Sequence, residues 1–482
     1  MSDIAFWSAK KLAAAIRRRK LGSLELLEHY WRRLERHNKA VNAVVATDLR
    51  AARKRAKAAD RALAKGEIWG PLHGVPMTVK DSFAAGSMPT NWGVPEFKDN
   101  RLPWNALAVD RFIAAGAVVF GKTNVPIWLA DWQSYNEIYG TTSNPWDLAC
   151  TPGGSSGGAA AALAAGLTGL EIGSDIGGSI RVPAHFCGVY GHKPTFGLCP
   201  NRGHALGDWA ASADISVIGP MARSAEDLAI ALEIMAGPEE FAGGGYRLVP
   251  ARPAKRRLRD FRVAVMESDP VAEVDAAVGD RLQDLLGFLA KSRVKVREAR
   301  PDIDMGRCLS VFVTMMIAAL SARQPAADFK RNLEAAQKLD PKDDSLTAAI
   351  IRGQVLHHKD WLVLNEQRHQ MRRRWARFFE DYDVLLCPTA PTVAFPHDHG
   401  PMNQRQVAIN GKKRPMNALF FWAGLTGISY LPSTVAPIGL SPQGLPVGVQ
   451  IVGPQYGDWV TIAFAQALER EYQGFQAPPK FV

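Results

Sequence analysis

The chain has 482 residues, of which 58 are Lys or Arg and 47 are Asp or Glu, so its formal net charge at pH 7 is +11. Hydrophobic residues make up 47% of the chain and charged residues 22%, which excludes a disordered or fibrous protein. At about 150 residues per domain, the length alone suggests about three domains. The Arg/Lys runs at 53–57 and 372–374 lack interleaved aromatic residues, so we interpret them as solvated helix faces and expect no nucleic-acid partner.

Cysteine usage and the apolar stretches bear on the compartment. The chain has an odd number of scattered cysteines with no C-x-x-C pair: Cys150, Cys187, Cys199, Cys308 and Cys387. This pattern disfavours a disulfide framework or a thiolate zinc site and favours a reducing compartment, the cytoplasm. The basic cluster at 17–20 follows the apolar residues near the N-terminus, unlike a secretory signal. The longest apolar stretch, 417–440, contains Gly and Pro residues, so we expect no membrane span.

Periodicity predicts alternating helices and strands in the first half of the chain. Leu24, Leu27, Trp31 and Leu34 recur at helical spacing after Ser23, which is a suitable N-cap, so residues 23–38 should form an amphipathic helix. The next elements, in chain order, are a helix at 47–65, a strand at 75–79, a helix at 107–115, a strand at 117–120 and a helix of small residues at 159–167. Such alternation predicts an α/β fold with a parallel or mixed sheet covered on both faces.

The second half continues this alternation less regularly. We expect a helix at 225–235, a surface connection at 237–257, a strand at 261–266, mostly helix at 300–380, and strands at 383–386 and 448–452. His397 and His399 resemble part of a metal site but lack a third clear ligand, so we expect a polar loop and no metal. No composition shift marks a clean domain boundary.

Two glycine-rich loops, 152–158 and 173–179, are the most unusual local feature. Loops of this kind offer free backbone N–H groups to a phosphate or an oxyanion. Neither loop continues as G-K-[ST] or matches G-x-G-x-x-G, which disfavours nucleotide binding. Residues 153–157 match G-x-S-x-G, so one alternative is a Ser-His-Asp hydrolase that uses Ser155. The turn-like residues before the loop weigh against it, and His185, His192 and His204 are more simply explained as structural or surface histidines.

Taken together, the two loops resemble the signature of a known enzyme family. Thr151-Pro-Gly-Gly-Ser-Ser-Gly-Gly158 and Gly173-Ser-Asp-Ile-Gly-Gly-Ser-Ile-Arg-Val-Pro-Ala184 closely resemble the amidase signature family. Upstream, Pro71-Leu-His-Gly-Val-Pro76 with Lys80-Asp81 matches further family motifs, as does Gly444-Leu-Pro-Val-Gly448 near the C-terminus. The resemblance is strong over residues 65–225, recognisable at 383–454 and loose in 240–380. It implies a three-layer α/β/α fold with a central mixed β-sheet covered by helices.

The resemblance also revises the domain count suggested by length. It implies a single amidase domain over 1–482, with N-terminal helices at 1–65, a signature core at 66–225, a variable helical region at 226–382 and a C-terminal part at 383–482. In that family, the serine matching Ser179 attacks the carbonyl, and the serine matching Ser155 bridges it to the lysine matching Lys80. This lysine must be neutral to accept a proton, so burial has to lower its pKa from about 10.4. The family chemistry requires no cofactor.

The resemblance assigns further roles around these three residues. The backbone N–H groups of Ile176, Gly177, Gly178 and Ser179 would form the oxyanion hole, where glycines permit close approach. We expect Asp175 and Arg181 to form a structural ion pair; a role for Arg181 in binding a substrate carboxylate is the lesser alternative. No activating partner for Cys187 or Cys199 is evident, so we expect no thiol nucleophile.

Substrate specificity is expected to come from the segment after Asn124 and from 300–430. Residues 126–134 depart from the Glu-Phe-Ala-Met-Gly-Ser pattern of the A-type subunit of glutaminyl-tRNA amidotransferases, and Trp128 suggests an apolar, partly aromatic pocket to which Phe420, Phe421 and Trp422 could add. The residues predicted to bind substrate are Leu129, Ala130, Trp132, Gly154 and Ser156. Ser156 is also expected to support its loop.

The sequence therefore predicts a stand-alone amidohydrolase of apolar or aryl amides that forms an acyl-enzyme on Ser179. Ester or carbamate (urethane) hydrolysis by the same machinery stays open. We expect a small-molecule amide substrate and a monomer or homodimer. Two other classes stay open: an A-type subunit of a glutaminyl-tRNA amidotransferase, which works with a partner, and a non-catalytic binding protein on the same fold.

Overall fold

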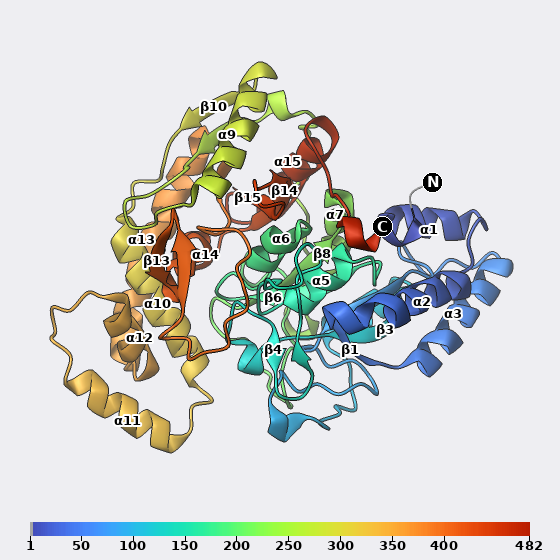
Figure 1. Ribbon diagram of the computed structural model, residues 1–482, viewed down its shortest axis with the longest axis horizontal. Helices are drawn as coiled ribbons and strands as arrows, with labels where there is room; N and C mark the ends of the chain where they lie inside the picture. The colour runs from blue at the N-terminus through green and yellow to red at the C-terminus, as the bar shows by residue number, and fades with distance from the viewer. Residues whose placement is uncertain (1–2) are drawn as a thin grey trace.

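An eight-stranded mixed sheet forms the centre of the computed structural model, which describes residues 3–482 apart from the side chain of residue 240 (Figure 1). Its strands in spatial order are β10 (Lys295–Glu298), β9 (Arg262–Val265), β11 (Val384–Pro388), β15 (Pro446–Val452), β14 (Ser433–Leu440), β7 (Tyr190–Lys193), β8 (Val217–Ala222) and β6 (Glu171–Asp175). The pairs β10–β9 and β9–β11 are parallel, and the other neighbours are antiparallel. The predicted mixed sheet is thus confirmed.

A second sheet of three strands carries the two strands predicted before residue 125. Its order is β1 (Val44–Thr47), β3 (Val118–Thr123) and β2 (Pro76–Lys80), with β2 and β3 parallel. This sheet adjoins β6, because the hydroxyl of Thr78 on β2 donates to the carboxyl group of Glu171. Lys80 is the last residue of β2, so it ends a strand of the smaller sheet. Two short hairpins complete the strands: β4 (Tyr135–Asn136) with β5 (Gly140–Thr141), and β12 (Gln406–Ile409) with β13 (Lys412–Pro415).

Fifteen α-helices surround the sheets within the part of the chain that the structure describes. They are α1 (Ala9–Arg17), α2 (Ser23–Val41), α3 (Leu49–Ala64), α4 (Leu107–Ala114), α5 (Gly157–Ala164), α6 (Arg181–Cys187), α7 (Ala225–Met235), α8 (Glu240–Gly243), α9 (Ala276–Lys291), α10 (Met305–Ser321), α11 (Ala326–Gln337), α12 (Leu346–Gln354), α13 (His358–Asp381), α14 (Phe420–Gly427) and α15 (Asp458–Glu471). The helices predicted in the first half of the chain are all present, with ends shifted by a few residues.

Alternation along the central strands explains the three layers. Side chains of successive strand residues point to opposite faces of a sheet. On β14, Val435 lies in a buried cluster with residues of α5 and α6, whereas Ala436 and Ile438 lie in the large cluster that includes residues of α7, α9 and α15. On β11, Leu385 lies with residues of α13 and α14, and Leu386 again belongs to the large cluster. Helices therefore cover both faces, which confirms the α/β/α architecture.

The start of α2 differs from the prediction in one detail. Ser23 is inside the helix and Gly22 is its N-cap residue, so the assignment of Ser23 as N-cap is wrong. The hydroxyl of Ser23 instead donates to the carbonyl of Gly74 at 2.8 Å. The N–H groups of Ser23 and Leu24, which have no partner within the helix, donate to the carboxylate of Asp60 on α3. A tertiary partner thus replaces the local cap.

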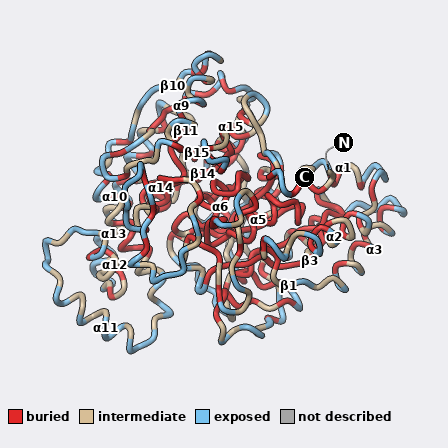
Figure 2. The backbone as a smooth tube through the Cα atoms, in the orientation of Figure 1, coloured by how far each residue is buried: buried red, intermediate tan, exposed pale blue. Residues whose placement is uncertain are grey.

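The helices α10 to α13, residues 305–381, form one side of the molecule (Figure 1). The predicted helical character of 300–380 is confirmed by four helices. None of the residues of α11 is buried, and Figure 2 shows this helix in the tan and pale blue of intermediate and exposed residues. In the described part of the chain, no helix combines the length and apolar character needed to cross a membrane.

Candidate active site

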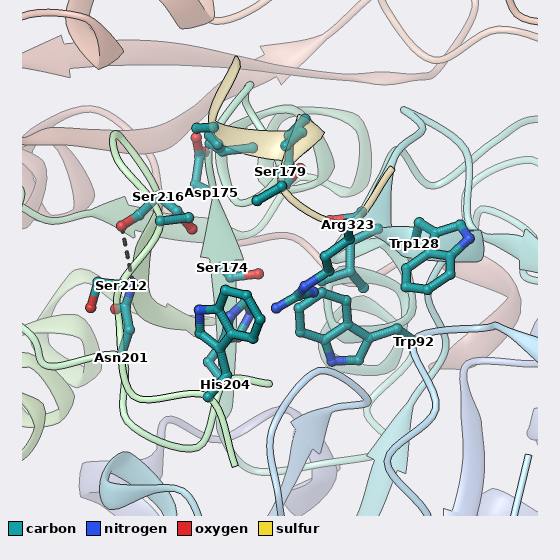
Figure 3. Close-up of a pocket in the computed structure, with 18 of the residues that line it drawn as sticks. Trp92, Trp128, Ser174, Asp175, Ser179, Asn201, His204, Ser212, Ser216 and Arg323 are labelled. Atoms are coloured by element: carbon teal, nitrogen blue, oxygen red, sulfur yellow. Dashed lines mark hydrogen bonds between the residues drawn. The ribbon is translucent and has the colours of Figure 1, made fainter. Parts of the chain in front are cut away.

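A cavity of about 270 Å³ opens where the ends of β6 and the loops before α5 and α6 meet (Figure 3). One side of it consists of small residues from the two glycine-rich loops. The other side consists of aromatic and apolar residues from distant loops and from the end of α10. The full set of lining residues is Trp92, Trp128, Leu129, Ser155, Ser174, Asp175, Ile176, Ser179, Asn201, His204, Trp209, Ala211, Ser212, Ala213, Ser216, Ala319, Leu320, Ala322 and Arg323.

Lys80 lies fully buried behind the serine side of this cavity. Its Nζ atom is 2.7 Å from the hydroxyl oxygen of Ser155, 2.9 Å from that of Ser156 and 3.0 Å from that of Ser174. No carboxylate pairs with it among the described residues. β2 fixes this position because Lys80 is its last residue and aligns with Thr123 on β3. Three hydroxyl groups therefore surround the amine.

The environment of Lys80 favours its uncharged form. Burial lowers its pKa from 10.5 to about 7, against the weaker opposing effects of Asp175 and Glu171. Glu171 is itself fully buried, and burial raises its pKa to about 8. A carboxyl group with this pKa is mostly protonated at neutral pH and so offers Lys80 little charge compensation. The amine can therefore accept a proton near neutral pH, as the predicted relay requires.

Ser155 and Ser179 come from different loops that one backbone contact holds together. The N–H of Ser156 donates to the carbonyl of Ser179 at 3.1 Å. Both serines line the cavity, with exposed fractions of 1% for Ser155 and 7% for Ser179. Ser155 contacts Lys80 directly, whereas among the described hydrogen bonds none joins the hydroxyls of Ser155 and Ser179. The lysine-to-serine half of the predicted relay is thus in contact, and the serine-to-serine half is not.

The backbone between β6 and α6 exposes several N–H groups beside Ser179. The N–H of Gly178 donates to Asp175 Oδ1 at 2.9 Å. Within the described structure, no hydrogen-bond acceptor is assigned to the N–H groups of Ile176, Gly177 and Ser179. Gly178 has a φ of +101°, and a Cβ there would lie 3.0 Å from a methyl group of Val182, so glycine suits this turn.

Asp175 and Arg181 form a fully buried ion pair, which confirms that prediction. Arg181 Nη2 lies 2.8 Å from Asp175 Oδ1, and Nε lies 3.0 Å from Oδ2. The remaining guanidinium nitrogen of Arg181 donates to Ala423, Thr426 and Gln450. Burial alone would raise the pKa of Asp175, but Arg181 holds it well below its usual range. This pair fixes the loop, and Arg181 is fully buried and is not a lining residue of the cavity, which disfavours a role in binding a substrate carboxylate.

The predicted substrate-binding residues occupy different places. Leu129 lines the cavity, whereas Ala130, Trp132, Gly154 and Ser156 are not among its lining residues. Trp132 supports the loop from behind, since its indole N–H donates to the carbonyl of Gly177 at 3.0 Å and its ring meets Phe420 edge-on. Gly154 is pressed against the backbone of residues 131–133, and Ser156 contacts Lys80. Ala130 is exposed.

Several lining residues were not predicted from the sequence. They are Trp92, Trp209, Leu320 and Arg323, together with His204, which we expected to be a structural or surface histidine. Burial lowers the pKa of His204 to about 3, so this histidine is neutral at pH 7. These residues come from three separate segments, and none lies in a recognisable motif. Their convergence had no signal in the sequence.

The other histidines and the cysteines have structural surroundings. His185 contacts backbone groups of Thr392 and Gly448, and His192 contacts Asp458 and Thr434 in the core. All five cysteines are free and buried. Burial raises the pKa of the Cys187 and Cys199 thiols, which disfavours the reactive thiolate. In the described structure, the residue that contacts the Ser155 hydroxyl is Lys80 and not a histidine.

Comparisons with known proteins agree with this geometry. The family model described as Amidase matches residues 25–461. The chain is 34% identical to an indoleacetamide hydrolase from Bradyrhizobium diazoefficiens, over 96% of this chain and 86% of that protein. It is 32% identical to human fatty-acid amide hydrolase 2, over 98% of this chain and 90% of that protein. The A-type subunit of the glutamyl-tRNA(Gln) amidotransferase from Methylococcus capsulatus is 33% identical, over 93% of each chain.

Solved structures show the same fold. A crystal structure of an amidase superposes with a TM-score of 0.76 at 28% identity, covering 96% of this chain and 99% of that one. The resemblance inferred from the glycine loops is therefore confirmed at the level of family and fold.

Proposed function

The chain belongs to the amidase family, and we propose that it hydrolyses apolar or aryl amides with Ser179 as nucleophile, Ser155 as proton bridge and Lys80 as base. One observation carries this proposal: a fully buried lysine, with a pKa of about 7, lies 2.7 Å from the hydroxyl of a serine that shares a cavity wall with Ser179. Amides are poor electrophiles, so their hydrolysis needs an activated nucleophile of this kind.

Acylation begins with a proton transfer through both serines. The hydroxyl of Ser179 gives its proton to Ser155, Ser155 passes its own proton to the neutral amine of Lys80, and the Ser179 oxygen bonds to the substrate carbonyl carbon. The two hydroxyls must approach each other for this step. Catalytic hydrogen bonds commonly become short only when substrate is bound, so the present geometry is compatible with it.

The same relay then runs in reverse. As the C–N bond breaks, the ammonium of Lys80 returns a proton through Ser155 to the departing nitrogen, and the acyl group stays on Ser179 as an ester. Water then attacks this ester, losing its proton to the relay, and releases the acid. The free N–H groups at Ile176, Gly177 and Ser179 stabilise the oxyanion in both steps. Gly178, whose N–H donates to Asp175, contributes the turn that lets its neighbours face the cavity.

The proposed substrate range follows from the cavity and from the relatives. Trp92, Trp128 and Leu129 give the cavity an apolar, aromatic side that suits aryl or alkyl groups. The names of the relatives include a fatty-acid amide hydrolase and an indoleacetamide hydrolase, both enzymes of apolar amides. A carbamate or an ester presents the same carbonyl to Ser179, so hydrolysis of urethanes or esters is part of the proposal.

The A-type subunit of an amidotransferase is the second candidate, because a relative with that name matches at 33% identity. Against it, Trp128 and Leu129 stand on the cavity wall, which favours apolar substrates over glutamine. Glutaminase activity that appears only with charged tRNA and a second subunit would favour this candidate.

We also propose that the protein is cytoplasmic, since five free, buried cysteines suit a reducing compartment. We propose that it is a monomer or a homodimer.

The nucleophile is tested by labelling and kinetics on single variants. We expect Ser179→Ala to abolish covalent labelling by a fluorophosphonate and to lower kcat for a 4-nitroanilide by at least about 10³-fold. Ser155→Ala should slow both reactions by about 10²-fold without abolishing labelling, because it removes only the proton bridge. Mass spectrometry of the labelled peptide identifies the modified serine.

Ser292→Ala, at the end of α9, is the matched control and should behave as the wild type. Labelling that survives in Ser179→Ala but disappears in Ser155→Ala would assign the nucleophile to Ser155. Full activity in Ser179→Ala would support a function that does not depend on this site, such as that of a binding protein.

A further inference from the structure

Arg323 is a cation in the cavity wall with no acidic partner. It follows the end of α10, is exposed to solvent and so lies at the open side of the cavity. No carboxylate forms an ion pair with it in the described part of the chain. Figure 3 shows its side chain extending into the cavity between Trp92 and His204. Because the guanidinium group is exposed to solvent and has no carboxylate partner, its five N–H donors can exchange water for an anionic ligand.

Two tryptophans hold the guanidinium group in place without using its hydrogen bonds. The guanidinium carbon lies 4.6 Å from the ring centre of Trp92 and 5.4 Å from that of Trp209. Stacking on aromatic faces orients the planar group and leaves its edge donors free. The side chain is thus positioned to donate to a planar anion such as a carboxylate.

Arg323 carries the dominant charge of the cavity lining. Asp175 is the acidic residue of the lining, and Arg181 already neutralises it. His204 is neutral at pH 7, and Lys80, whose pKa is about 7, is only partly charged at that pH and lies buried behind the lining. Among the described lining residues, Arg323 is therefore the one cation with no counter-charge. The lining therefore carries a net positive charge at the open side of the cavity, which favours an anionic ligand.

We propose that the preferred substrate is an amide whose aromatic or apolar body carries a carboxylate, and that Arg323 binds this carboxylate at the open side of the cavity. This inference rests on the proposed function, since it places the amide carbonyl at Ser179. The tryptophans contact the body of the substrate, and the cavity of about 270 Å³ limits it to a small molecule. Arg323 is then a specificity residue that takes no part in bond cleavage.

Two pairs of substrates test the proposal and locate the carboxylate. N-glutaryl-4-nitroanilide against N-pentanoyl-4-nitroanilide tests a carboxylate on the acyl half. 4-Acetamidobenzoate against 4-methylacetanilide tests one on the amine half. In at least one pair, the wild type should prefer the anionic member in kcat/KM by about tenfold, mainly through KM. Salt at about 0.5 M should reduce this preference, since the ion pair is partly exposed.

Arg323→Gln should bring the preference to within about twofold of unity by lowering kcat/KM for the anionic member far more than for the neutral member, and Arg323→Lys should retain part of the preference. Arg331→Gln is the matched control: it removes the same charge from α11, where Arg331 pairs with Asp328 at 2.8 Å outside the cavity, and should keep the full preference. Circular dichroism and Tm of each variant establish that it is folded.

Three outcomes would overturn the inference. The first is hydrolysis of the neutral members by the wild type with no preference in either pair, which leaves the proposed function intact. The second is an equal loss of kcat/KM for both members of a pair in Arg323→Gln, which would mean that Arg323 shapes the cavity without recognising the carboxylate. Failure of the wild type to hydrolyse any of the four, together with no fluorophosphonate labelling, would overturn the proposed function as well.

Discussion

The two sides of the cavity are built in opposite ways. The inner wall, which we define as Ser155, Ser174, Asp175 and Ser179, is buried and its side chains are short. The hydroxyls of Ser155 and Ser174 contact Lys80, and Asp175 pairs with Arg181. The outer wall, which we define as Trp128, Trp209, Leu320 and Arg323, is exposed, with exposed fractions of 42% for Trp128 and 51% for Trp209. The inner wall comes from two neighbouring loops of the chain, and the outer wall from three distant segments.

This difference separates chemistry from specificity. A buried amine and fixed backbone donors need no reorganisation when charge develops in a transition state, so the inner wall suits catalysis. Exposed aromatic groups can contact different substrates with small changes in free energy. We therefore expect substitutions in the inner wall and its support to change kcat or stability strongly, and substitutions in the outer wall to change KM moderately.

The largest effect is expected at Lys80, behind the inner wall. Lys80→Met should lower kcat by about 10³- to 10⁴-fold, because it removes the proposed proton acceptor. In the wild type, kcat/KM should rise with pH and level off above a pKa near 7, since only the neutral amine can act as the proposed base. Stopped assays of 4-nitroanilide hydrolysis from about pH 5 to 9 measure this. A profile that falls over this range would contradict the assignment of Lys80 as base.

Lys80 should also affect how stability depends on pH. Its pKa is about 7 in the folded chain against 10.5 for an ordinary lysine, so the unfolded chain binds more protons between these values. The contribution of Lys80 to the free energy of unfolding therefore rises with pH from about 7 to 10.5. Urea unfolding of Lys80→Met and the wild type at about pH 7 and pH 9 measures the difference. An equal pH dependence in both proteins would indicate that Lys80 has an ordinary pKa.

The ion pair that supports the inner wall should dominate stability. Arg181→Met leaves the carboxylate of Asp175 buried without its partner, so the free energy of unfolding should fall by about 3–5 kcal/mol. Lys10→Met is the matched control, because Lys10 pairs with Glu226 at the surface, where both side chains are about half exposed. It should cost at most about 1 kcal/mol. Similar losses of unfolding free energy in both variants would contradict the expectation that breaking the buried ion pair costs more than breaking the exposed one.

The smallest effect is expected on the outer wall. Trp128→Ala should raise KM for aryl amides by about three- to tenfold with little change in kcat, because it removes apolar contact area that the ground state and the transition state share. Trp104→Ala is the control, since Trp104 has a similar exposed fraction of 38% and is not a lining residue. A drop in kcat with unchanged KM would instead connect Trp128 to the chemical step.

Much of the fold was accessible from local patterns. Helix periodicity and β-prone runs predicted α2, α3, β2, α4 and β3 and the mixed sheet, because these depend on neighbouring residues, whereas the short strand β1 was not predicted. The division into two sheets was not predicted: the run at 75–79 looks like any buried strand, and its pairing with β3 joins residues far apart along the chain, such as Pro76 and Val118. The prediction of Ser23 as the N-cap of α2 was wrong for the same reason, since Asp60, on another helix, accepts the hydrogen bond from the Ser23 N–H.

The inner wall could be inferred from the sequence because its chemistry constrains short segments. Gly178, beside Ser179, has a φ of +101° that favours glycine, and the resemblance to the amidase signature family then connected Lys80, Ser155 and Ser179. In the outer wall, Trp128 was expected at an apolar pocket from the sequence, but the other members were decided by the tertiary structure alone. Trp209, Leu320 and Arg323 meet Trp128 only when separate segments converge, and a tryptophan or arginine in isolation has no pattern that separates a cavity wall from an ordinary surface. Local chemistry thus determined the family and the predicted nucleophile, and long-range packing determined the face that meets the substrate.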